Sequence, residues 1–212
     1  MILEPLHSWL SESSSLISSH RHGNTSTITT YLLHKHLKEN RTVTILHHPG
    51  DLCKQHFTAL LSKCGVNVAE VVSTSKLCFV ELSCPLDSPP DLVGSLEKLA
   101  GSNVVFIMEV HVLSGIGCSV RDVLEFMQRL LRRKDQIVVA TTRVSEETAQ
   151  LNTLLGVLLG SVTCLDTLES GASKDVDGHV THSSQGVERR ALYKGSERGV
   201  RVFPLGTSPG TV

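Results

Sequence analysis

The chain has 212 residues, of which 40% are hydrophobic, 19% are charged and only 4% are aromatic. Its 20 basic and 21 acidic side chains leave a formal charge of −1, which excludes a strongly basic protein that binds nucleic acid by itself. No apolar run approaches the roughly 20 residues that span a bilayer, and the first ten residues lack the pattern of a secretion signal. We therefore expect one domain over residues 1–212, in a cytoplasmic or nuclear protein that does not enter a membrane.

Six cysteines and eleven histidines raise the question of a metal site. The cysteines are scattered without a Cys-x-x-Cys pair and mostly have apolar neighbours, which favours reduced core residues. The closest histidine pairs are His20 with His22, His34 with His36, and His47 with His48. None of them has a partner three or four residues away, and no Cys, Asp or Glu cluster completes a ligand set. We expect no metal and no cofactor.

Short apolar runs alternate with amphipathic stretches over residues 14–165, which is typical of a parallel sheet wrapped by helices. In chain order, we expect strands at 15–18, 42–47, 66–72, 77–82, 104–110, 137–141 and 162–165. The more apolar run at 77–82 is expected to be more central than 66–72. Helices are expected at 25–38, 52–64, between 91 and 101, at 119–131 and at 145–158. The helix at 119–131 is the most regular of these, and it begins with a pair typical of a capping box, Ser119 and Asp122.

The composition changes beyond Asp166, where a linker-like segment at 170–173 leads into a C-terminal part at 175–212. The pair Asp177-Gly178 predicts a tight hairpin turn. The spacing of the neighbouring aspartates does not fit an EF-hand, so calcium is not expected. Residues 191–194 and 200–203 predict an antiparallel hairpin that extends one edge of the sheet.

Phosphate sites of parallel sheets lie beyond the carboxyl ends of the strands, which directs attention to the loop after the first strand. There, Gly23, Asn24 and Thr25 match only the second half of the P-loop pattern. Asparagine replaces the lysine that reaches the phosphates, and Ser18 stands where the first glycine belongs. A plain turn before a helix also explains these residues.

Two later strand ends have the matching polar residues of a nucleotide site. Glu109 lies at the end of strand 104–110, in a degenerate Walker B-like position, and Thr141 and Thr142 lie where a γ-phosphate sensor would be. No other catalytic motif is present, neither G-x-S-x-G nor His-Glu-x-x-His. The residues therefore indicate a P-loop architecture that has lost its catalytic parts.

Five arginines are candidates for contact with RNA: Arg129, Arg132, Arg133, Arg189 and Arg190. The first three lie at the end of the predicted helix 119–131, where cations also complement the helix dipole. Both interpretations stay open from the sequence.

The order of several segments carries a resemblance to a known family. These segments are 23–25, Val66 followed by 77–81, 123–126, 175–178 and the ending 200–212 around a Gly-x-Ser-Pro. In this order they resemble the family of the sixth subunit of the Elongator complex. The sequence departs from the family's pattern in a shorter region between Leu82 and Val104, and in Glu109-Val110-His111 where an acidic pair is common.

The resemblance implies an α/β fold of the RecA-like P-loop NTPase class, with a mostly parallel central sheet flanked by helices and without working Walker motifs. It implies a pseudo-ATPase and not an enzyme, joined to Elongator subunits four and five in a hetero-hexameric ring with two copies of each. Through assembly and tRNA handling, this ring would support modification of the tRNA wobble uridine, whose chemistry belongs to another subunit. The residues alone leave two alternatives open, a P-loop-derived nucleotide-binding enzyme and a RecA-like recombination paralogue acting on DNA.

Overall fold

The computed structural model describes residues 13–20, 25–48, 52–82, 90–99, 101–168, 173–196, 199–203 and 205. A single nine-stranded sheet runs through these residues in the order β3-β2-β4-β5-β1-β6-β7-β8-β9. Among the helices of the described chain, none is long and apolar enough to cross a membrane.

Six strands form the parallel part of the sheet: β1 (Ser15–His20), β2 (Val43–His47), β3 (Leu77–Glu81), β4 (Val104–Ile107), β5 (Ile137–Val144) and β6 (Ser161–Thr167). Three more strands continue it in antiparallel fashion: β7 (Gly178–Ser184), β8 (Val187–Ser196) and β9 (Gly199–Phe203). The predicted α/β class is confirmed, and so is the C-terminal hairpin, which is formed by β8 and β9 at the sheet edge.

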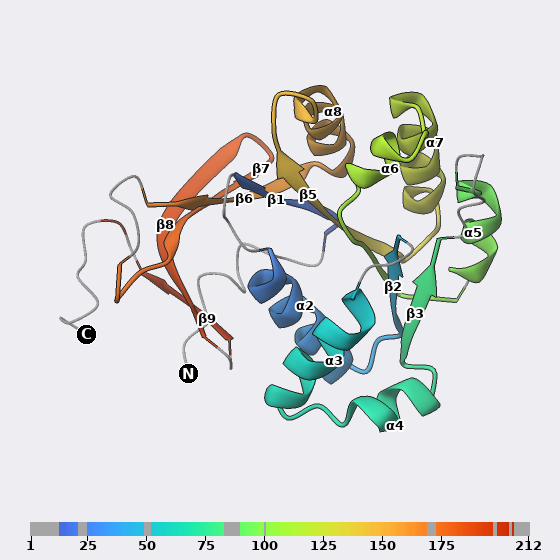
Figure 1. Cartoon of the computed structure of the whole chain (residues 1–212), viewed down its shortest axis with the longest axis horizontal. Helices are drawn as coiled ribbons and strands as arrows, with labels where there is room; N and C mark the ends of the chain where they lie inside the picture. Colours follow the sequence, from blue (N-terminus) through green and yellow to red (C-terminus); the bar gives the residue numbers. More distant parts are fainter. Residues whose placement is uncertain are drawn as a thin grey trace.

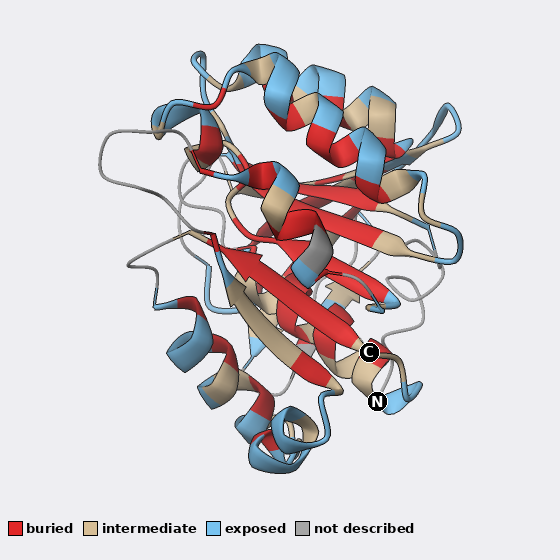
Figure 2. Ribbon diagram, turned by 90° about the vertical axis from the view of Figure 1, so that its right-hand side faces the viewer, coloured by how far each residue is buried: buried red, intermediate tan, exposed pale blue. Residues whose placement is uncertain are grey.

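Helices cover the two faces of the parallel part (Figure 1). One layer holds α2 (Ser26–Lys38), α3 (Cys53–Lys63) and α4 (Val68–Ser73), and the other holds α5 (Leu92–Lys98), α6 (Val112–Gly115), α7 (Val120–Leu131) and α8 (Ala149–Leu159). Because successive strand residues face opposite sides, each strand supplies two apolar cores. In β2, for example, Ile45 packs on the α2 side and Leu46 on the α7 side. Figure 2 shows the buried strands between the two helix layers.

The chain path diverges at the carboxyl ends of the neighbouring strands β1 and β5. After β1 the chain leaves along α2 on one face, whereas after the neighbouring β5 it leaves along α8 on the opposite face (Figure 1). Ligands of open α/β sheets bind at such divergences, beyond the carboxyl ends of the strands. β4, which ends close to Glu109, lies on the other side of β5.

Two predictions about the middle of the chain are wrong. Residues 66–72 do not form a strand, because Asn67 caps a helix there, α4, by accepting the N–H of Glu70. The β-branched residues of this stretch are a weaker signal than the cap. The strand expected to be central, β3, is the edge strand and pairs only with β2.

The predicted turn at Asp177-Gly178 is also wrong, because Gly178 begins β7. The tight turn falls instead at Gln185 and Gly186, whose φ angles of 51° and 78° suit a type I′ hairpin between β7 and β8. Asp177 instead accepts the backbone N–H of Gly195 over 2.7 Å and so ties the start of β7 to β8.

Other local predictions are confirmed or refined. The capping box of α7 is present, with Ser119 and Asp122 each accepting the other's backbone N–H. All five described cysteines are free thiols, but only Cys53 and Cys118 are buried. The remaining three, Cys64, Cys78 and Cys164, are half-buried.

Candidate functional site

β4 ends at an acid whose backbone is in an unusual conformation. The strand stops at Ile107, three residues before the predicted end, and Glu109 has a φ of 50°. This left-handed conformation costs a residue other than glycine about 1–2 kcal/mol. It is held by Thr141 of β5, whose hydroxyl accepts the Glu109 N–H over 2.8 Å and whose carbonyl accepts the Val110 N–H over 2.8 Å. β5 therefore fixes the position of Glu109.

The carboxylate of Glu109 already has partners within the chain. The Thr141 hydroxyl donates to its Oε1 over 3.4 Å, and the Nε of Arg143 lies 3.4 Å from its Oε2. The Glu109 side chain is 22% exposed and that of Arg143 is 71% exposed, so the ion pair lies at the boundary with water. A Walker B-like acid acts through Mg²⁺. Here a cation of the protein occupies that side of the carboxylate.

His111 joins this cluster as a neutral acceptor. The backbone N–H of Arg143 donates to Nδ1 of His111 over 3.3 Å, so this nitrogen has no proton of its own. Burial lowers the pKa of His111, and the Glu109 carboxylate opposes this effect only in part. Although Nδ1 lies 3.7 Å from Oε2 of Glu109, a neutral imidazole forms no ion pair there.

Thr142 faces α8 and takes part in a separate network. Its hydroxyl donates to Oδ1 of Asn152 over 2.8 Å. The Nδ2 of Asn152 and the hydroxyl of Thr148 both donate to the carbonyl of Arg143, over 3.0 and 2.8 Å. The two threonines predicted as phosphate sensors are fully buried. Their hydroxyls hold the end of β5 against the chain after β4 and against α8.

The degenerate P-loop lies only partly within the described residues. Thr25 is buried just before α2, and its carbonyl accepts the N–H of Thr29, but its side chain does not cap the helix. Gly23 and Asn24 lie outside the described residues. The assignment of residues 23–25 to a former nucleotide loop stays a prediction.

The five arginines predicted to contact RNA fall into two groups that the structure does not bring together. Arg129, Arg132 and Arg133 belong to the end of α7, while Arg189 and Arg190 lie on β8, on the opposite side of the molecule (Figure 1). Arg129 is paired with Glu125 over 2.6 Å, and Arg133 donates to the carbonyl of Leu96. Contact with RNA stays a prediction for each group by itself.

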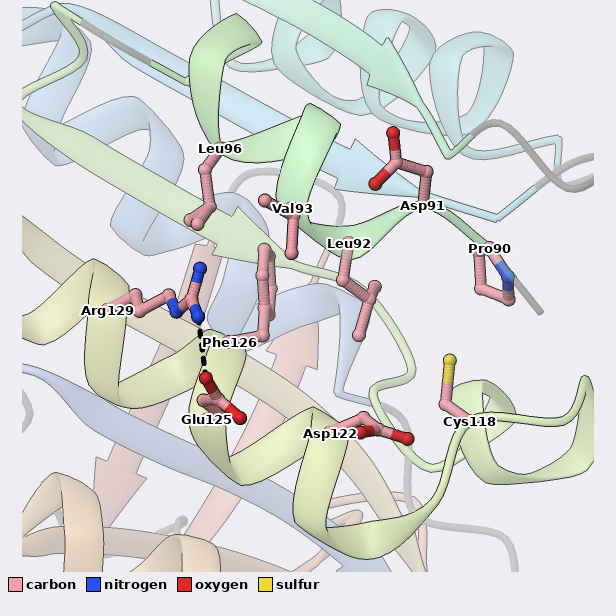
Figure 3. Close-up of a pocket in the computed structure, with 10 residues that line it drawn as sticks. All are labelled: Pro90, Asp91, Leu92, Val93, Leu96, Cys118, Asp122, Glu125, Phe126 and Arg129. Carbon is pink, nitrogen blue, oxygen red and sulfur yellow. Dashed lines mark hydrogen bonds and ion pairs between the residues drawn. The ribbon is translucent and has the colours of Figure 1, made fainter.

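A groove of about 340 Å³ lies between α5 and α7 (Figure 3). Leu92, Leu96 and Phe126 form its apolar part. Its polar residues already have partners, because Asp122 caps α7 and Glu125 binds Arg129. These groups stabilise the helix, and they form no pair suited to catalysis.

A second cluster of chemically active side chains lies at the ends of β1 and β6. One donor atom each of His20, Cys164 and Asp166 lie within 4.8 Å of one another. No sequence motif indicates this cluster, because His20 lies far from Cys164 and Asp166 in the chain. The roles of Arg143 and Asn152 were likewise not predicted, although Arg143 lies two residues beyond Thr141 and such residues share one face of a strand.

Among solved structures, the chain is similar to a KaiC-like protein, PH0186, from the hyperthermophilic archaeon Pyrococcus horikoshii OT3. The TM-score is 0.65 with 12% sequence identity, over 91% of this chain and 90% of that chain. No protein-family model and no curated protein sequence matches the chain. The similarity in structure confirms that the fold is RecA-like. At this identity it establishes the fold and no activity.

Proposed function

We propose that this chain is a non-catalytic subunit of the Elongator complex, the sixth, within an accessory ring that it forms with subunits four and five. In this role it contributes to modification of the tRNA wobble uridine through ring assembly and tRNA handling, in the cytoplasm or also in the nucleus. Two things support the proposal: the RecA-like fold over most of the chain, and the order of sequence segments that resembles this family.

The observation that carries the non-catalytic part is the pair formed by Glu109 and Arg143. Phosphoryl transfer on a P-loop scaffold needs a lysine on the phosphates and an acid that helps to hold Mg²⁺. The sequence has Asn24 in place of that lysine, and the strand-end acid has a guanidinium nitrogen 3.4 Å from its oxygen. A positive charge in this place repels a metal ion.

Exposed apolar side chains on α8 favour a role in assembly. Val157 is 79% exposed and Leu154 is 38% exposed, and the two lie three residues apart on one side of the helix. Single exposed apolar residues are ordinary on protein surfaces. A pair on one helix face, in a chain expected to form a ring, is consistent with contact to a neighbouring subunit.

The test is affinity purification of the full chain from cells, with identification of co-purifying proteins by mass spectrometry. We expect recovery of the other Elongator subunits, with subunits four and five in equal amounts. A chain that is a monodisperse monomer and binds neither subunit four nor subunit five would overturn the proposal. A Glu109→Gln variant should support wobble-uridine modification at the level of the wild type, and loss of modification in a complex that still assembles would contradict the non-catalytic role.

A second candidate, a nucleotide-binding enzyme of P-loop descent, is favoured by one observation: Thr141 and Glu109 meet at the carboxyl edge of neighbouring strands. Calorimetry with ATP and Mg²⁺ on the purified protein separates the two. A dissociation constant below about 100 μM, roughly −5.5 kcal/mol, would favour the enzyme. A recombination paralogue is less well supported, because the two arginine groups lie on opposite sides of the molecule.

A further inference from the structure

We propose that His20, Cys164 and Asp166 form a binding site for a zinc ion at the carboxyl ends of β1 and β6. The Nε2 of His20 lies 3.9 Å from Oδ1 of Asp166, and the Sγ of Cys164 lies 3.9 Å from Oδ2 of the same carboxylate. One donor atom from each residue lies within 4.8 Å of the other two. An imidazole, a thiol and a carboxylate thus converge on one point.

The central strands of the sheet hold these three residues in place. β1 and β6 pair in parallel, with Ser18 opposite Cys164 and Ser19 opposite Leu165. Since strand residues alternate between faces, His20 follows on the same face as Cys164 and Asp166. Sites built on paired strands are held more precisely than sites on loops.

The donor set suits zinc in number, type and spacing. Zn²⁺ accepts sulfur, nitrogen and carboxylate oxygen, and ligand atoms around a tetrahedral ion lie about 3.3–3.6 Å apart. The observed separations therefore need to shorten by a few tenths of an ångström to about one ångström, which small side-chain rotations achieve. Ser18 is buried and lies opposite Cys164 on β1, where a polar neighbour can orient a metal ligand.

Part of this cluster is open to solvent. His20 and Asp166 are each a little under half exposed, and they line a pocket of about 580 Å³ together with His179, Thr181 and Arg190. Three protein ligands with an open fourth position are the arrangement of zinc sites that hold a water or an exchangeable ligand. The pocket leaves room for either.

An ordinary surface ion pair between His20 and Asp166 is the simpler alternative. Such a pair contributes little to stability and does not involve a thiol. The two interpretations therefore differ in what they expect of Cys164, which is a ligand in one and a bystander in the other.

The experiment is a zinc titration of the full chain after removal of metal by a chelator, with a competing chromophoric chelator as the reporter. We expect one equivalent to bind with a dissociation constant below about 1 μM. Co²⁺ in place of Zn²⁺ should give a sulfur-to-metal charge-transfer band, which requires a thiolate ligand.

Three variants and one control test the ligand assignment. Cys164→Ser, His20→Gln and Asp166→Asn should each weaken zinc binding by more than about tenfold. Cys78→Ser is the matched control, since Cys78 is also a half-buried free thiol but lies on the edge strand β3, which β2, β4, β5 and β1 separate from β6. It should bind zinc and give the cobalt band as the wild type does.

Two results would overturn the proposal. One is the absence of stoichiometric binding at about 10 μM free zinc, ten times the expected dissociation constant. The other is an unchanged zinc affinity in the Cys164→Ser variant. If this variant does not fold, as judged by circular dichroism, the other two decide. His20 and Asp166 are both part-exposed at strand ends, so their conservative variants are expected to keep the fold. Zinc binding is independent of membership in Elongator, so either proposal can fail without the other.

Discussion

At the end of β4, the carboxylate of Glu109 has an arginine and a threonine hydroxyl against it, whereas at the end of β6 the carboxylate of Asp166 faces a histidine and a thiol. Both acids lie at the carboxyl edge of the same parallel sheet, on strands separated by β5 and β1.

The difference lies in what accompanies each acid. A guanidinium is always charged and cannot ligate a metal, so Arg143 completes the first cluster without any ion. The imidazole and the thiol of the second cluster are metal ligands, and an ion would bring them together with the carboxylate. The same edge of the sheet therefore has one cluster that is closed to cations and one that is suited to them.

A buried histidine of α2 makes the stability of the whole chain depend on pH, and this effect adds to any change at the two clusters. His36 is 3% exposed, and burial above all lowers its pKa to about 4, with Arg41 adding to this effect. In the unfolded chain the group takes up a proton near pH 6.5. The free energy of unfolding should therefore fall by up to about 3 kcal/mol as the pH drops from 6.5 to 4.

This prediction is checked by urea unfolding at a series of pH values between 4 and 7.5. His36→Leu should flatten that profile, because it removes the group whose proton uptake differs between the two states. His56→Gln, on the exposed side of α3, should leave the slope as it is. A wild-type profile that is flat over this range would refute the assignment.

The second cluster depends on a close backbone approach that the first does not have. A Cβ at Gly178 would lie 1.9 Å from the carbonyl oxygen of Asp166, so Gly178→Ala must push β7 away from β6. We expect a loss of about 2–3 kcal/mol in unfolding free energy, together with weaker zinc binding. At Gly115 nothing lies within 4 Å of an added Cβ, so Gly115→Ala is the control and should change stability little. Equal effects in the two variants would contradict this account.

The first cluster depends on the hydroxyl of Thr141. Thr141→Val keeps the shape of the side chain but leaves the Glu109 N–H without its acceptor, and we expect a cost of about 1–2 kcal/mol. The matched control is Thr153→Val on the exposed side of α8, where the lost bond is only to the carbonyl of Ala149. Chemical denaturation measures both, and a difference below the error of the method would show that Glu109 is not held in this way.

The smallest effect is expected for the ion pair itself. Because Arg143 is 71% exposed, Arg143→Gln should change the unfolding free energy by less than about 1 kcal/mol, and 0.5 M salt should reduce that change further. A loss well above this value would mean that the guanidinium has a structural role beyond its contact with Glu109.

Much of the fold could be predicted from local patterns. The apolar run at 104–107 predicts β4, because a strand that is buried on both faces is apolar at every position. The capping box at Ser119 and Asp122 predicts the start of α7, because both of its residues lie within one turn of the chain. The β-branched residues of 66–72 predict a strand, but the N-cap at Asn67 starts a helix there, because a local cap is the stronger signal. Asp177-Gly178 has the composition of a turn, yet Gly178 is needed for its contact with the backbone of β6.

Local sequence patterns specify the class of fold, the alternation of strands and helices, the hairpin at the C-terminus and the acid at the end of β4. The order of the strands could not be predicted in this way, since strand pairing depends on contacts between residues that are distant in the chain. The same reason explains both clusters. Glu109 lies beside Arg143, and His20 lies close to Cys164, because the sheet brings strand ends together. No spacing along the sequence predicts either proximity.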